Sequence, residues 1–321
     1  MRKRTHNPKP VCWHLLWPLP LLFYLLLSGC AGTATKDDEQ AESKDVQQQV
    51  QQAIAQGDQE FRKGDLERAL FNYVTALNLD PDNVDALYRV GVLETENGNP
   101  EAAERAFSRV LAVNPDHAGA LEGRGLVLLR QRKYGAAKQM LEQSVSIEAS
   151  RWRAYNGLGV IADIENDHAL ATSYYQLALE QRPGTPLVLN NLGYSYYLAG
   201  DWASAEEAFR QALATDPKHA KAWSNLAMLH VRKGEYDLAL RAFTKVMDKP
   251  EAYNSMGYIC MLEGKFEQAE SFLLNAVKLS PSYYQEAHEN LARARARLAA
   301  EPDIAVPNTT YGLQVQDPTP P

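Results

Sequence analysis

A 34-residue period runs through the middle of the chain and constrains its fold more than any other feature. Small residues recur at Gly57, Gly91, Gly125, Gly159, Gly193 and Ala227, each 34 residues after the last, and then at Gly257 after 30. Alanines keep the same spacing from Ala69 to Ala269, and aromatic or leucine residues keep it from Tyr73 to Leu273. A fixed period of this length predicts a stack of similar units, each burying its apolar face against its neighbours.

One unit is enough to see that each repeat is a pair of helices. Leu189 and Tyr196 fall on the same helical stripe as Gly193, and the chain is then broken by Gly200 and Asp201. The apolar residues that follow continue the helical spacing up to a proline. Because Gly193 has no side chain, the two helix axes are expected to approach to about 8–10 Å.

This pattern resembles the tetratricopeptide repeat. The resemblance implies an all-α fold, a solenoid that winds as a right-handed superhelix of about seven helix hairpins over residues 50–300. The run EAHENLARARARL, within residues 283–300, predicts a polar-backed helix that caps the open end of the stack. The sixth repeat is four residues short around Pro250, which predicts an altered joint there.

The first thirty residues have the layout of a secretory signal, with a basic start and an apolar run from Val11 to Leu27. The run ends in Leu27-Ser28-Gly29-Cys30, which resembles a bacterial lipobox. This resemblance implies that residues 1–29 are removed and that Cys30 carries covalent lipid. Because Ala31 follows the cysteine, the same resemblance implies that the protein is anchored at the periplasmic face of the outer membrane. The alternative is an uncleaved membrane anchor, which the prolines in the run disfavour.

The two segments that flank the repeats differ from them in composition. Residues 30–49 are polar and rich in Gln, which predicts a flexible tether between the lipid and the repeats. Residues 301–321 hold five prolines and few large apolar groups, which predicts a disordered tail.

Charge and motifs exclude several classes of function. The formal net charge is -7, and residues 1–29 hold four basic residues and no acidic one, so the remainder is more acidic still. We therefore expect no nucleic-acid partner. The sequence has no P-loop, GxSxG, HExxH or CxxC motif, so we expect no enzyme activity, no metal site and no small-molecule substrate. The cysteines, Cys12, Cys30 and Cys260, build no disulfide framework, and the lipid on Cys30 is the only expected cofactor-like group.

Each first helix of a repeat carries a second face, which in tetratricopeptide arrays lines the concave channel. The middle row of that face is apolar, and amide side chains accompany it, a combination suited to an extended or helical peptide. The predicted partner-binding residues are Asn156, Val160, Asn190, Asn191, Tyr194, Tyr197, Asn225, Met228, Asn254 and Tyr258. The alternative is that the row only packs between repeats, an interpretation that applies best to Val92 and Leu126.

A lipobox, a short tether and a chain of these repeats resemble the pilotin-like lipoproteins of pilus assembly. The runs NNLGYSYYLAG, AWSNLAMLHVRKGEYDLAL, KPEAYNSMGYICMLEGKFEQAE and LSPSYYQEAHENL are most similar to the TadD family of the tight-adherence (Flp) pilus system. That resemblance implies a lipid-anchored scaffold that binds an outer-membrane secretin or another pilus-assembly component. Two alternatives stay open, a type IV pilus pilotin and a scaffold for periplasmic cell-wall hydrolases or proteases.

Overall fold

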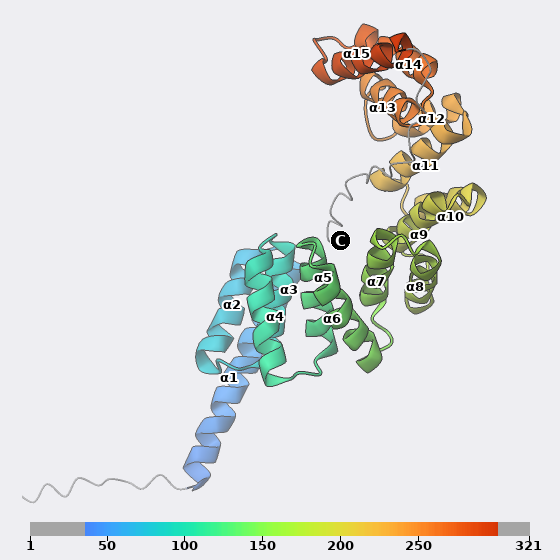
Figure 1. Ribbon diagram of the computed structural model, residues 1–321. Helices are drawn as coiled ribbons and strands as arrows, with labels where there is room; N and C mark the ends of the chain where they lie inside the picture. Colours follow the sequence, from blue (N-terminus) through green and yellow to red (C-terminus); the bar gives the residue numbers. More distant parts are fainter. Residues whose placement is uncertain (1–35, 301–321) are drawn as a thin grey trace, which may run out of the picture. The chain divides into compact units, whose positions relative to one another are not determined.

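Helices make up nearly all of residues 36–300, the part of the chain that the computed structural model describes (Figure 1). They are α1 (Lys36–Arg62), α2 (Leu66–Leu79), α3 (Val84–Glu96), α4 (Pro100–Val113), α5 (Ala118–Arg130), α6 (Tyr134–Ile147), α7 (Trp152–Ile164), α8 (His168–Gln181), α9 (Pro186–Ala199), α10 (Trp202–Thr215), α11 (Ala220–Lys233), α12 (Tyr236–Phe243), α13 (Lys249–Leu262), α14 (Phe266–Leu279) and α15 (Gln285–Ala299). No strand occurs in this range. The prediction of an all-α fold with seven hairpins and a terminal helix is confirmed.

Each hairpin pairs a first helix (odd-numbered, α1 to α13) with the second helix that follows it, and a missing side chain lets the two approach. A Cβ atom added to Gly91 would lie 2.5 Å from the ring of Phe107, and one added to Gly159 would lie 2.5 Å from Tyr175. Both rings are 1% exposed, so they occupy the space that a larger residue would need. Burial of one such ring contributes about 1.5–3 kcal/mol to stability. Each hairpin needs both the ring and the glycine that makes room for it, so the two positions repeat with the same 34-residue period.

Polar side chains fix where the helices begin. Asp65 and Asp167 each accept a hydrogen bond at 3.0 Å from the backbone N–H three residues further on, as helix N-caps do. His117 and His219, three periods apart, cap α5 and α11 in the same way, with Nδ1 accepting from the backbone N–H of Ala120 or Ala222 at 3.1 Å. The repeat geometry therefore accounts for both histidines.

The core is shared between successive hairpins. In one cluster, Leu189 and Phe209 of the fifth hairpin pack with Leu226 and Leu229 of the sixth. The buried Ser144 hydroxyl donates to the carbonyl of Ala118 at 2.9 Å, which ties α6 to α5 within the third hairpin. A hairpin thus completes its core only with a neighbour, so the stack is stabilised from unit to unit.

The short sixth repeat loses its residues from the end of its second helix. α12 has 8 residues, whereas α10 and α14 each have 14. α13 then begins with a capping box, in which Asp248 accepts from the Glu251 N–H at 2.9 Å and Glu251 accepts from the Asp248 N–H at 3.3 Å. The predicted change of the joint is located between Phe243 and Asp248.

Of the predicted flexible tether over residues 30–49, the described part, residues 36–49, is instead helical, because α1 begins at Lys36. The run from Lys36 to Gln56 has neither Gly nor Pro and is rich in Glu, Gln, Lys and Ala, which favour a helix. Val50 and Ile54 are 2% and 3% exposed and pack with Ala76 and Ala86, so tertiary contacts fix the helix as well. A polar composition therefore accompanies a helix here and does not indicate a flexible segment.

The helix predicted to cap the last hairpin is present as α15. Its residues Leu291 and Ala294 are 6% and 0% exposed and join the cluster around Met256 and Leu273. Cys30, the predicted signal sequence over residues 1–29 and the predicted tail over residues 301–321 lie outside the described residues. Among those described, no helix has both the length and the apolar composition needed to cross a membrane.

Candidate partner-binding groove

The first helices form a continuous layer. The backbone of each first helix from α3 to α13 lies close to that of the next odd-numbered helix, whereas the backbones of successive second helices from α4 to α14 do not come this close. The first helices are therefore nearer to one another than the second helices are, so they line the inner face of the stack. The predicted row on this face, here called the inner row, is Val92, Leu126, Val160, Tyr194, Met228 and Tyr258.

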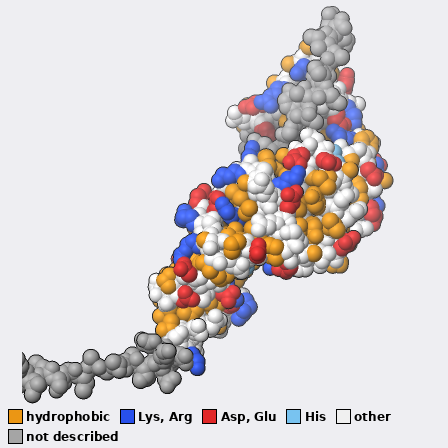
Figure 2. All heavy atoms as spheres, turned by 60° about the horizontal axis from the view of Figure 1, so that its bottom comes forward, with side chains coloured by type: hydrophobic (Ala, Val, Ile, Leu, Met, Phe, Trp, Pro, Cys, Tyr) orange, Lys and Arg blue, Asp and Glu red, His pale blue; other side chains and the backbone are white. Residues whose placement is uncertain are grey.

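Every member of the inner row keeps part of its surface exposed. Tyr258 is 39% exposed, and the other five are half-buried. Apolar side chains also gather in patches among acidic and basic ones on the face shown in Figure 2. A row of apolar groups that the fold leaves accessible is the kind of surface through which proteins bind partners.

The asparagines beside the row bind one another. The side-chain amide of Asn191 donates to Oδ1 of Asn156 at 2.9 Å, and that of Asn225 donates to Oδ1 of Asn190 at 2.9 Å. Asn254 is joined in the same way to Asn290 of α15, at 3.1 Å. Asn156, Asn190 and Asn254 are 6%, 4% and 4% exposed. These amides connect neighbouring first helices, which differs from the expectation that they face a partner.

Tyr197 is also a packing residue. It is 4% exposed and stacks against Tyr194, with 6.0 Å between the two ring centroids. The Arg232 guanidinium lies 4.7 Å from the centroid of the Tyr197 ring. Burial raises the pKa of the Tyr197 hydroxyl to about 12. Of the predicted tyrosines, Tyr194 and Tyr258 are therefore the two that remain accessible.

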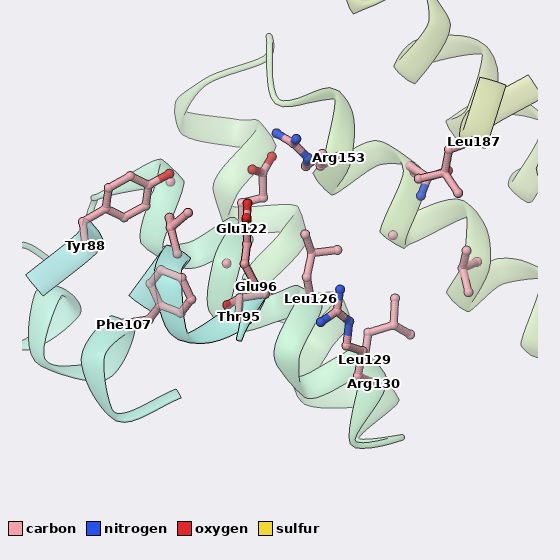
Figure 3. A pocket seen from close by; sticks show the side chains of 16 residues that line it. Tyr88, Thr95, Glu96, Phe107, Glu122, Leu126, Leu129, Arg130, Arg153 and Leu187 are labelled. Atoms are coloured by element: carbon pink, nitrogen blue, oxygen red, sulfur yellow. The ribbon is translucent and has the colours of Figure 1, made fainter. Parts of the chain in front are cut away.

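A pocket of about 200 Å³ opens on the inner face between α3, α5, α7 and α9 (Figure 3). Its walls include Val92, Leu126 and Val160 of the inner row. Val92 and Leu126, for which packing between repeats was the better interpretation, therefore line a pocket. Tyr88 and Phe107 lie on one side in Figure 3 and Leu187 on the other.

Three glycines outside the repeat pattern line this pocket: Gly119, Gly123 and Gly157. Gly123 and Gly157 precede Asn191 by two periods and one period, at the position where Asn191 and Asn225 carry the amide contact. With glycine at 123 and 157, this amide contact cannot form between α3 and α5 or between α5 and α7, whereas Asn191 makes it with Asn156 between α9 and α7.

Two acidic residues, Glu96 and Glu122, and two basic residues, Arg130 and Arg153, line the pocket. Glu122 is 8% exposed, and its carboxylate lies 3.9 Å from Nη1 of Arg151. Burial raises the pKa of Glu122, against the opposing effect of Arg151 and Arg153. Arg153 stacks at 4.8 Å on the ring of Trp152, and no carboxylate in the described part of the chain forms an ion pair with it.

Family models of the tetratricopeptide repeat match the chain over residues 57–98, 93–139, 126–186, 190–252 and 250–283. Together these matches span most of the described helices. The chain is a tetratricopeptide-repeat protein. No curated protein sequence matches it.

Solved structures of other tetratricopeptide-repeat proteins share the fold. Pseudomonas aeruginosa PilF is 19% identical and matches with a TM-score of 0.53, covering 78% of this chain and 99% of its own. A tetratricopeptide repeat protein of Parabacteroides merdae gives 0.54 at 16% identity, covering 77% and 99%. PilW, described as a widely conserved type IV pilus biogenesis factor, gives 0.51 at 16% identity, covering 75% and 98%. At these identities the likeness concerns the fold.

The pocket residues Tyr88, Glu122 and Arg153 were not predicted from the sequence. Tyr88 and Glu122 precede Asn156 by two periods and one period, so extending that column toward the N-terminus would have found both. Because Tyr and Glu differ chemically from Asn, the pattern of amide side chains did not include these two positions. Arg153 is three residues before Asn156, one turn outside the predicted rows.

One cluster of this tetratricopeptide-repeat protein combines histidine and carboxylates. Glu206, His230 and Glu235 have ligand atoms within 4.8 Å of one another. Lys233 already bridges the two carboxylates, at 2.8 Å from Glu206 and 3.0 Å from Glu235, and Nδ1 of His230 lies 2.6 Å from Glu235. The cluster is thus an internally paired network that joins α10, α11 and α12.

Proposed function

We propose that this chain is a lipid-anchored scaffold for pilus assembly, which binds a segment of an outer-membrane secretin on its inner face and is held at the outer membrane by lipid on Cys30. The observation that carries the proposal is the inner row, six apolar side chains on successive first helices that all keep exposed surface. A partner laid along the stack would contact several repeats at once, and each would add its own apolar area.

The tight-adherence (Flp) pilus is the favoured system because of the sequence resemblance to the TadD family, which includes the short joint before α13. The second candidate is a type IV pilus pilotin. It is favoured by the structural likeness to PilW, a type IV pilus biogenesis factor. The two candidates share the scaffold and the membrane anchor and differ in the secretin that is bound.

The test is affinity purification of the full chain from detergent-solubilised membranes, followed by mass spectrometry of the captured proteins. We expect a secretin, and the pilin genes beside its gene would tell an Flp system from a type IV system. A Tyr194→Ala/Tyr258→Ala variant is expected to lose most of the secretin while keeping its helical circular dichroism. Capture of peptidoglycan enzymes without a secretin would overturn the proposal.

The anchor is tested separately. Cys30→Ser is expected to move the protein from the membrane fraction to the soluble periplasmic fraction, because acyl chains contribute about 0.8 kcal/mol per buried CH₂ group to membrane binding. Retention of the variant in the membrane would contradict the lipid anchor and leave the scaffold role to the capture experiment.

A further inference from the structure

The hollow between α3, α5, α7 and α9 has the size and lining of a site for one side chain. Its volume is about 200 Å³, and its walls include Phe107, Leu126, Leu129 and Val160. An apolar cavity of about 150 Å³ is enough to hold a benzene molecule. One phenylalanine-sized ring therefore fits, whereas a drug-sized ligand, which needs about 300 Å³ or more, does not.

The hollow arises from particular residues and is not a gap that the repeat leaves everywhere. A Cβ atom added to Gly123 would lie 2.4 Å from Phe107, and one added to Gly119 would lie 2.9 Å from the Tyr88 hydroxyl. These two glycines bring α5 close to the rings of the preceding hairpin, and Gly157 brings α7 close to Leu141, which would lie 2.8 Å from an added Cβ atom. In the later repeats the same column carries Asn191 and Asn225, whose amides join neighbouring first helices.

The charged residues that line the pocket determine which side chain of a partner can lie beside a bound aromatic ring. Two acidic groups line the pocket: Glu96 is exposed, and the buried Glu122 faces Arg151 at 3.9 Å, so Glu122 offers little to a ligand. Two basic groups, Arg130 and Arg153, line the pocket, and Arg153 is half-buried and stacks on Trp152. Figure 3 shows Glu122 and Arg153 on neighbouring helices at the same side of the pocket. A guanidinium without an ion-pair partner in the described chain favours a carboxylate.

We propose that this pocket anchors the partner by a single aromatic side chain, and that an acidic residue next to it in the partner's sequence pairs with Arg153. The occupant is thus a polypeptide segment with an Asp-Phe or Glu-Phe type of step. The proposal rests on the proposed function, since it names the chemistry of the segment that the inner face binds. It adds to the tyrosines of the later repeats a second contact region, the pocket formed by the second to fifth hairpins.

The experiment uses the full chain in detergent micelles and a hexapeptide probe, acetyl-Ala-Gly-Asp-Phe-Gly-Ala-amide, with 4-fluorophenylalanine at the Phe position. Binding is measured as broadening of the fluorine NMR line, with empty micelles as the blank. We expect saturable binding that weakens about tenfold when Asp is replaced by Lys in the labelled peptide. The peptide with Ala in place of Phe carries no fluorine and is used as an unlabelled competitor, which we expect to displace the probe about tenfold less well than the unlabelled Phe peptide does. No saturation up to about 10 mM peptide would overturn the proposal.

Val160→Tyr tests the position of the ring. The inner row already holds tyrosine at positions 194 and 258, so a tyrosine side chain is compatible with this row. At position 160 it would fill the pocket. We expect about tenfold weaker peptide binding, against less than about twofold for the control Val74→Tyr, which adds the same ring to exposed α2. Equal effects would overturn the proposal. If Val160→Tyr loses its circular dichroism signal, Val92→Tyr makes the same test from α3.

Arg153→Gln tests the charge. Arg182 is its matched control, because it also stacks on Trp152, at 5.1 Å, but does not line the pocket. Arg153→Gln is expected to abolish the preference for the Asp peptide over its Asn analogue, and Arg182→Gln to keep it. An unchanged preference in both variants would remove Arg153 from the site. The peptide result does not depend on which proteins are captured from membranes, so this proposal and the proposed function can fail separately.

Discussion

The side-chain amide of Asn225 donates to Oδ1 of Asn190 at 2.9 Å, across the boundary between the fifth and sixth hairpins. Asn191 makes the same 2.9 Å contact with Asn156 one period earlier. Both contacts join residues 35 apart, one more than the repeat length. Successive first helices are therefore linked by a polar bond as well as by apolar packing, and that bond is made by residues that the sequence pattern assigns to the partner surface.

Removal of this bond should destabilise the stack. Asn225→Ala leaves the amide of Asn190, which is 4% exposed, without its donor, and a buried polar group left unpaired costs about 1–3 kcal/mol. The loss should appear as a lower midpoint in urea unfolding followed by circular dichroism. Gln211→Ala, at an exposed position of α10, is the control and should change stability by less than about 0.5 kcal/mol. Equal midpoints for the two variants would show that the contact adds nothing to stability.

The glycines of the repeat should differ sharply in their tolerance of a methyl group. Gly91→Ala places a Cβ atom 2.5 Å from Phe107 and should cost about 1–3 kcal/mol through overpacking. Gly135→Ala, near the start of α6, meets no atom within 4 Å and should stabilise by about 0.5–1 kcal/mol, because alanine loses less backbone entropy in a helix. Thermal unfolding of both variants checks the opposite signs. A destabilised Gly135→Ala would contradict the packing explanation.

The sequence was sufficient for the hairpins and insufficient for the contacts between them. Gly91 and Phe107 meet within one hairpin, so their shared period predicts their packing. The partner of Asn225 depends instead on how far one first helix is shifted along the next, which a period does not state. The pocket at Gly123 could not be predicted for the same reason, because its shape depends on how several helices pack against one another.

Cys260 should be inert in the folded protein. It is 0% exposed, and burial raises the pKa of its thiol to about 11. The thiolate is the reactive form, so both effects slow modification. In a chain with Cys12→Ser and Cys30→Ser, a disulfide reagent at about pH 8 should react roughly 100-fold more slowly than with the same chain in urea. Similar rates in the two conditions would show that α13 opens readily around Cys260.

The cap of α11 should weaken in mild acid. Nδ1 of His219 accepts the Ala222 N–H at 3.1 Å, which requires the neutral ring. Burial lowers the pKa of His219 below 6.5, with Lys221 acting in the same direction and Asp216 opposing. The unfolded chain therefore binds the proton more readily than the folded one, so stability falls as the pH drops below 6.5.

His219→Asn keeps an N-cap acceptor that does not titrate in this range. Relative to the wild type, its free energy of unfolding should rise by about 1 kcal/mol between roughly pH 7.5 and pH 5, because only the wild type loses its cap. Lys218→Asn, at the exposed neighbouring position, should show a difference from the wild type that is nearly constant over the same range. Urea unfolding at several pH values measures both differences, and a constant difference for His219→Asn would mean that the ring stays neutral and bonded throughout.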